Sequence, residues 1–204
     1  MVRSWNDSRR AFLDAADWFV RTTALVGDRW SQAGLGEWDV RALVGHTSRS
    51  LLTVETYLAH PAEAVDVPSA EDYFRATRAT AAASAVAARG RDAGIALGSE
   101  PAAAVAGISA RVLRLVDAQD GSELVTTLAG GMRLVDYLPT RTFELAVHTA
   151  DLATAIGVPP EVPATTAQEA LQIVAGLAVA DGLAGRLLLL ATGRPLRSAG
   201  FSVL

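Results

Sequence analysis

A glutamate and a histidine stand four positions apart in a stretch with a helical pattern. Glu144 and His148 lie in the run RTFELAVH, which begins at Arg141. Side chains four residues apart in an α-helix lie one above the other on the same face. A carboxylate and an imidazole placed in this way can bind one divalent metal ion, so this pair is the first candidate for chemistry in the chain.

Two ligands do not complete a metal site, because catalytic zinc sites usually have three protein ligands and one open position. His46 is the best third ligand, since it lies one turn after Leu43 on the apolar stripe of its own expected helix. Helical bundles commonly build metal sites from facing helices. His46, Glu144 and His148 are therefore the predicted metal ligands. On spacing alone, a surface Glu–His pair and a hydrogen-bonded core histidine remain alternatives.

Two further charged residues share the face of His148, within roughly 60° at about 100° per residue. Asp151 could accept a hydrogen bond from His148 and orient it, or it could be a solvated residue of the last turn. The guanidinium of Arg141 could hold a carboxylate of a substrate or cofactor, which makes Arg141 the predicted catalytic residue. A salt bridge from Arg141 to Asp136 or Asp151 is the alternative.

Two other residues carry chemistry in principle, but their positions indicate ordinary structural roles. His60 precedes Pro61, where we expect an exposed residue at a helix end. Trp38 is expected to pack at the start of its helix rather than to stack on a ligand.

Helices must position these side chains. Apolar residues at three- and four-residue spacing, with capping residues near the ends, predict six of them. They extend from Ser4 to about Val26, Val40 to about Leu58, Ser69 to near Gly90, Ser99 to about Ala118, Leu134 to Ile156, and Thr165 to about Ala191. Asp39 offers an N-cap for the second helix, and Gly182 or Gly185 is the expected break in the last.

Short extended segments complete the expected fold. Residues 125–128 read as extended and precede Gly130 and Gly131, which predicts a hairpin or an irregular crossing. Residues 201–204 read as a β-like tail. The sequence thus predicts an all-α protein, a single domain over residues 1–204 built as one bundle of four main helices with short peripheral extended segments.

The composition excludes several classes of protein. Half of the residues are apolar and only 6% are aromatic, a mixture that favours helices built on Ala and Leu. The net charge of −4 provides no basic footprint for nucleic acid. Cysteine is absent, so a metal must be bound by His, Asp or Glu. No apolar run approaches the length of about 18 residues that a membrane span needs, and no signal peptide is evident, so we expect a soluble cytoplasmic protein.

Three segments carry a resemblance to a known family. They are residues 38–46 (WDVRALVGH), residues 141–152 (RTFELAVHTADL), and Thr192-Gly193-Arg194 with Phe201-Ser202-Val203-Leu204. Together they closely resemble the N-terminal domain of the mycothiol-dependent maleylpyruvate isomerase family, which belongs to the DinB-like metalloproteins. The resemblance implies a DinB-like four-helix bundle that binds Zn²⁺, or Ni²⁺ or Fe²⁺ in its place, through His46, Glu144 and His148.

The resemblance also implies a chemistry, that of thiol S-transferases and isomerases that act with mycothiol or a similar small thiol. A metal with an open position would keep the thiol as a thiolate at neutral pH. That thiolate could add to an electrophilic carbon, and in a maleyl-type substrate rotation and thiol elimination would complete isomerisation. The isomerase itself has a further C-terminal domain, which this sequence lacks, so maleylpyruvate is not the expected substrate.

We therefore expect a metal-dependent enzyme that acts on a small-molecule thiol and an electrophilic substrate. A homodimer is compatible with the sequence. A hydrolase or cyclase that uses the same ligands without a thiol is the alternative, and a non-catalytic metal-binding stress protein is a further one. Two histidines and a carboxylate also occur in non-haem iron oxygenases, but a helical Glu–His pair lacks their sequence context.

Overall fold

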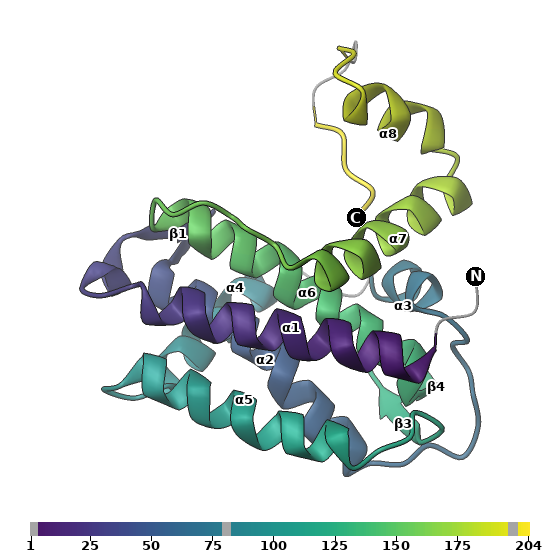
Figure 1. The fold of residues 1–204 in the computed structure, drawn as a ribbon, viewed down its shortest axis with the longest axis horizontal. Coiled ribbons are helices and arrows are strands. Elements are labelled where there is room, and N and C mark those ends of the chain that lie inside the picture. Colours follow the sequence, from purple (N-terminus) through teal and green to yellow (C-terminus); the bar gives the residue numbers. More distant parts are fainter. Residues whose placement is uncertain (1–3, 79–82, 196–199) are drawn as a thin grey trace.

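The chain is mostly helical in the computed structural model, which describes residues 4–78, 83–195 and 200–204. These residues form eight α-helices, one short 3-10 helix and two small antiparallel sheets (Figure 1). The prediction of an all-α protein is confirmed at this level.

The helices and strands have the following bounds. The α-helices are α1 Trp5–Ala24, α2 Val40–Leu58, α3 Ala70–Thr77, α4 Ala83–Ala96, α5 Pro101–Asp117, α6 Leu134–Ala155, α7 Ala164–Ala180 and α8 Ala184–Ala191. The 3-10 helix is η1 Arg29–Ser31, the first sheet pairs β1 Ala33–Leu35 with β2 Trp38–Asp39, and the second pairs β3 Leu124–Thr127 with β4 Gly130–Arg133.

The start of α2 is defined by local hydrogen bonds. The side chain of Asp39 accepts a hydrogen bond from the backbone N–H of Ala42 at 2.7 Å, as predicted for an N-cap. The next residue, Val40, donates its N–H to the carbonyl of Gln32 at 2.9 Å, which ties the β1–β2 pair to the helix. These bonds set where α2 begins and therefore where His46 lies along it.

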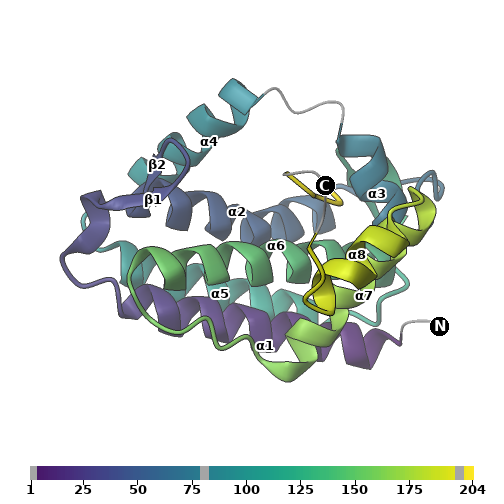
Figure 2. The same ribbon diagram turned by 90° about the horizontal axis from the view of Figure 1, so that it is seen from above.

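The long helices enclose the core. α1 and α2 each pack against both α5 and α6, and large buried side chains such as Phe12, Phe19, Leu43, Leu51 and Leu145 fill the space between them. α7 packs on α1 and α6. In Figure 2, α3 and α4 lie on the same side of α2 and α6, toward opposite ends of those helices.

The C-terminal helices extend beyond this body. α8 packs against α7, and Figure 1 shows it projecting away from the other helices. Within the described residues no single helix has the length and apolarity of a membrane span; only α4 and α5 taken together, bent by 98° at their junction, reach that length and composition.

One helix end differs from the prediction, and one expected break is confirmed. The third expected helix was to end near Gly90, but α4 continues through Gly90 to Ala96. Gly90 does not end the helix, because its backbone does not take the positive φ of a helix-ending glycine. The ring of Trp38 occupies the space that a Cβ at this position would need. Residues 79–82, in the middle of that expected helix, lie outside the described residues. The predicted break in the last helix is confirmed at Gly182, which has a φ of +69°, whereas Gly185 lies inside α8.

The extended segments were predicted with mixed success. The hairpin near Gly130 is confirmed as β3 and β4, and Pro61 adds a bridge to Val125. The β1–β2 pair was not predicted. The tail at residues 201–204 is not a strand; the carbonyl of Val203 accepts its hydrogen bond from the side chain of Arg78, at 2.8 Å.

Candidate metal centre

The three predicted ligands come together at the contact between α2 and α6. Glu144 and His148 lie one turn apart on α6, with His148 Nε2 3.3 Å from Glu144 Oε2. His46 on α2 faces His148, with ring centroids 4.8 Å apart and planes at 82°. One ligand atom from each of the three residues lies within 4.8 Å of the other two. Two nitrogens and one carboxylate oxygen thus converge on one point.

This cluster is reachable from solvent. The side chain of Glu144 is 24% exposed and that of His148 is 17% exposed, and His46 is half-buried. Partial exposure of all three groups fits a site that must admit an ion and an exogenous ligand. A purely structural site would be closed by a fourth protein ligand.

Asp151 orients one of the two imidazoles. Its Oδ2 lies 3.1 Å from Nδ1 of His148, which places Nδ1–H on the carboxylate and leaves Nε2 directed at Glu144. Metal-binding histidines generally have such an acceptor on the nitrogen that does not bind the ion. The orienting role considered for Asp151 is therefore matched by the geometry.

The two histidines have opposite electrostatic surroundings. Burial, and secondly the charge on His148, lower the pKa of His46 to about 4. Burial alone would also lower the pKa of His148, but its hydrogen bonds to Asp151 and Glu144 raise it to about 9. Burial would raise the pKa of Glu144, yet His148 and Arg141 hold it below its usual value. At neutral pH the cluster therefore contains a neutral His46, a charged His148 and an ionised Glu144.

His46 has an unsatisfied polar atom. Among the described residues, its buried Nδ1 has no hydrogen-bond partner. A buried polar atom without a partner costs free energy. Two imidazoles and a carboxylate within reach of one another are a donor set that fits a divalent metal such as Zn²⁺.

Arg141 lies one turn before Glu144 and is deeply buried, with only 8% of its surface exposed. Its Nε donates to the hydroxyl of Thr140 at 2.9 Å. The guanidinium lies over the rings of Tyr73 and Tyr137, 5.3 and 5.1 Å from their centroids. Aromatic faces stabilise such a cation, but they do not neutralise it.

The alternative salt bridges of Arg141 are not formed. Asp136 pairs with Arg133 at 2.7 Å, and Asp151 is occupied by His148. Within the part of the chain that the structure describes, Arg141 forms no ion pair. The alternative of a salt bridge to Asp136 or Asp151 is not realised, because Asp136 pairs with Arg133 and Asp151 with His148.

A family comparison covers the whole of this cluster. The family described as the mycothiol maleylpyruvate isomerase N-terminal domain matches residues 12–153. The chain belongs to this family. No curated protein and no solved structure matches the chain. Within the family match lie His46, Arg141, Glu144, His148 and Asp151, whereas α7 and α8 fall outside it.

The sequence analysis did not predict a cluster of tyrosines near Arg141. The three tyrosines of the chain all gather near Arg141: Tyr57 and Tyr73 lie 5.3 and 5.9 Å from Tyr137, centroid to centroid. They come from α2, α3 and α6, so only the packing of those helices brings them together. The sequence hints at this cluster only through the small number of tyrosines, three in the whole chain.

The remaining predicted residues lie as follows. His60 is exposed and its Nδ1 contacts the carbonyl of Thr56 at 2.7 Å, away from the cluster, as expected. Trp38 packs at the start of α2, but its ring also lies against His46, with centroids 4.4 Å apart. That second contact was not expected.

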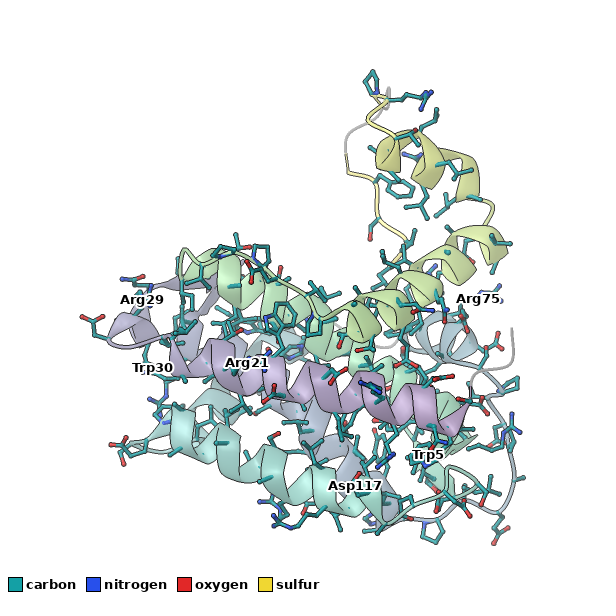
Figure 3. The ribbon with its side chains drawn as sticks, viewed as in Figure 1. Trp5, Arg21, Arg29, Trp30, Arg75 and Asp117 are labelled. Atoms are coloured by element: carbon teal, nitrogen blue, oxygen red, sulfur yellow. The ribbon has the colours of Figure 1, made fainter. Side chains whose placement is uncertain are left out.

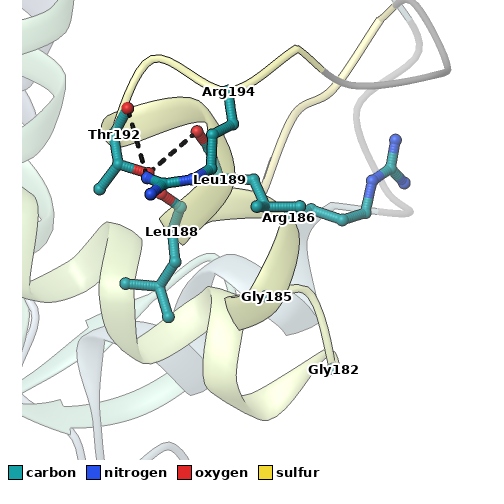
Figure 4. Close-up of a pocket in the computed structure, with 7 residues that line it drawn as sticks. All are labelled: Gly182, Gly185, Arg186, Leu188, Leu189, Thr192 and Arg194. Carbon is teal, nitrogen blue, oxygen red and sulfur yellow. Dashed lines mark hydrogen bonds between the residues drawn. The ribbon is translucent and has the colours of Figure 1, made fainter.

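Two surface cavities lie apart from the metal centre. One of about 690 Å³ is formed by residues 182–194 around α8, where the hydroxyl of Thr192 donates to the carbonyl of Leu188 at 2.7 Å (Figure 4). The other, about 600 Å³, lies between Glu55 on α2, Leu115 on α5 and Val125 on β3. Neither is lined by a candidate ligand.

Proposed function

We propose that this protein is a divalent-metal enzyme that uses a low-molecular-weight thiol, mycothiol in the first place, as cosubstrate for S-transfer or isomerisation. Zn²⁺ is the first candidate ion, with Ni²⁺ or Fe²⁺ as substitutes. The proposal rests on one observation above all: ligand atoms of His46, Glu144 and His148 lie within 4.8 Å of one another. Membership of the mycothiol maleylpyruvate isomerase N-terminal domain family supports the choice of thiol.

The residues present suit an open metal site. Three protein ligands leave a position for an exogenous group. A divalent ion bound here would hold a thiol sulfur as thiolate at neutral pH, as zinc does for bound water. Asp151 keeps Nε2 of His148 available for binding because its Oδ2, 3.1 Å from Nδ1, accepts the Nδ1–H. Partial exposure of Glu144 and His148 leaves a path for the cosubstrate.

Arg141 is the proposed anchor for an acid group. It is a buried cation without an ion pair among the described residues, and burial of a charge that is not directly paired is costly. Arg141 lies three residues before Glu144 on α6, about 4.5 Å along the helix axis. A carboxylate bound in its planar fork would place the rest of a small substrate beside the metal ligands.

The proposed fold is the DinB-like four-helix bundle. Its four main helices would be α1, α2, α5 and α6, because α1 and α2 each pack against both of the others. In this arrangement the metal ligands lie on two adjacent helices of the bundle, as in other helical metal sites.

Elemental analysis with a thiol assay tests the proposed function. We expect the purified protein to contain about one divalent ion per chain, as three ligands and one open position require, and to conjugate mycothiol to a generic electrophile only when loaded. Loaded protein without thiol turnover would instead favour a hydrolase, a cyclase or a non-catalytic role. Folded protein that takes up no added Zn²⁺, Ni²⁺ or Fe²⁺ would contradict the proposal altogether.

A further inference from the structure

The two histidines of the metal centre are held in different ways. His148 has a carboxylate acceptor, Asp151, on its Nδ1. The buried Nδ1 of His46 has no such partner among the described residues. Histidine ligands usually depend on a hydrogen bond of this kind for their orientation. Another contact must therefore orient the imidazole of His46.

We propose that Trp38 is a positioning residue that orients His46 for metal binding, and that α4 is the element that holds Trp38 in place. This inference rests on the proposed metal site. The indole of Trp38 lies against the imidazole of His46, with centroids 4.4 Å apart and planes inclined by 33°. The same imidazole meets the ring of His148 nearly edge to face. Contact with two rings restricts rotation of the His46 side chain.

The indole is itself anchored to α4. Trp38 is 9% exposed, and its Nε1–H donates to the carbonyl of Ala87 at 3.0 Å. A Cβ atom at Gly90 would lie 2.6 Å from Cε2 of the indole, so the ring occupies the space that a side chain at position 90 would need. The hydrogen bond and the missing side chain together fix the position of the ring against α4.

The same helix also contacts the backbone beside His46. Gly45 directly precedes His46, and a Cβ atom there would lie 2.1 Å from the backbone nitrogen of Gly94. Arg41 reinforces this contact, because its Nε donates to the carbonyl of Gly94 at 2.9 Å. Gly90 and Gly94 lie four residues apart on one face of α4. One face of α4 therefore holds both the indole and the α2 backbone next to the ligand.

A matched control exists at the other end of the molecule. Trp5 donates its Nε1–H to the carbonyl of Gln119 at 3.1 Å and packs on Gly121, where a Cβ would lie 2.7 Å from the ring. Figure 3 shows Trp5 at the start of α1, near Asp117 at the end of α5. Trp5 thus has the same kinds of structural contact as Trp38, and no histidine ring contacts it within the described parts of the chain.

The experiment compares Trp38→Ala and Trp38→Phe with Trp5→Ala and Trp5→Phe. Zn²⁺ affinity is measured by competition with a chromophoric chelator, and the visible spectrum of bound Co²⁺ reports ligand geometry. We expect Trp38→Ala to lose about 10- to 100-fold in Zn²⁺ affinity, the range typical for residues that orient a ligand, and to alter the Co²⁺ spectrum. Trp38→Phe keeps a ring and should recover part of both. The Trp5 variants should lower the melting temperature without changing either.

Fluorescence provides a readout that does not depend on the alanine variant folding. Co²⁺ quenches an indole only at short range, so Co²⁺ should quench part of the emission of the wild type and of Trp5→Phe, and this part should be absent from Trp38→Phe. If the wild type binds Zn²⁺ and Co²⁺ but the folded Trp38 variants match it in affinity and spectrum, the inference is wrong and the proposed function stands. A wild type that binds neither ion overturns both.

Discussion

His46 and His148 face each other across the α2–α6 contact with ring centroids 4.8 Å apart and planes at 82°. They belong to different helices, and the segments between them include α3, α4, α5 and the β3–β4 hairpin. Two imidazoles in this relation, with Glu144 beside them, are suited to share one ion. The following predictions test that arrangement and the elements that support it.

His46→Ala should abolish tight metal binding while the protein stays folded. Loss of one of three ligands should weaken Zn²⁺ binding by more than the roughly 100-fold loss seen when an orienting residue is removed. Metal content after dialysis and circular dichroism measure the two effects. His60→Ala is the control, since His60 is exposed and the hydrogen bond of its ring within the described residues is to the carbonyl of Thr56. Equal metal content in both variants would remove His46 from the site.

Asp151→Asn should weaken Zn²⁺ binding by about 10- to 100-fold and lower the pKa of His148 in the metal-free protein. The direction follows because the hydrogen bond to Asp151 is the largest of the influences that raise this pKa to about 9. NMR titration of the imidazole measures it. Asp136→Asn is a matched control on the same helix, because Asp136 pairs with Arg133. A His148 pKa that does not move in Asp151→Asn would exclude the orienting role.

Metal binding at neutral pH should release about one proton, because a histidine must be neutral to bind an ion. His148 has a pKa of about 9 in the metal-free protein and is charged at pH 7, whereas His46, with a pKa of about 4, is already neutral. The apparent Zn²⁺ affinity should therefore rise with pH and level off above about pH 9. Calorimetry in buffers of different ionisation enthalpy counts the proton. Release of none at pH 7 would contradict the assigned charge states.

Gly45→Ala should destabilise the protein by about 1–3 kcal/mol or more, the usual range for overpacking. The new Cβ would lie 2.1 Å from the backbone nitrogen of Gly94, and two helix backbones cannot relax as a side chain can. Denaturant unfolding measures the free energy. Gly107→Ala is the control: nothing lies within 4 Å of a Cβ at this exposed site in α5, so it should stabilise the helix by up to about 1 kcal/mol. Similar effects of the two substitutions would argue against close packing of α4 on α2.

Arg141→Met should reduce turnover of acidic substrates without lowering the stability of the protein. Replacing a buried cation that has no ion pair with an apolar side chain should leave the free energy of unfolding unchanged or raise it, since burial of the charge is costly. Metal content should not change, but turnover of acidic electrophiles should fall relative to neutral ones. Parallel assays with a charged and an uncharged electrophile measure this ratio. An unchanged ratio would show that Arg141 anchors no acid group.

Capping residues and apolar periodicity in the sequence were sufficient to predict many of the helices and one hairpin. The predicted bounds of the second helix, Val40 to Leu58, are those of α2, because an N-cap and an apolar period are short-range signals. The hairpin at Gly130 was predicted for the same reason. The predicted end of the third helix was wrong. A glycine can either end a helix or allow a close contact, and the contact of Gly90 with the ring of Trp38, which shows the second role, is visible only in the structure.

The sequence by itself determined that Glu144 and His148 share a face, because four residues make about one helical turn in any α-helix. It also placed His46 on an inward stripe, which made it a candidate. Only the tertiary structure decided that His46 meets His148, that Trp38 stacks on His46, and that three tyrosines gather near Arg141. Helical periodicity sets directions within one helix, whereas the pairing and register of different helices depend on packing over the whole core.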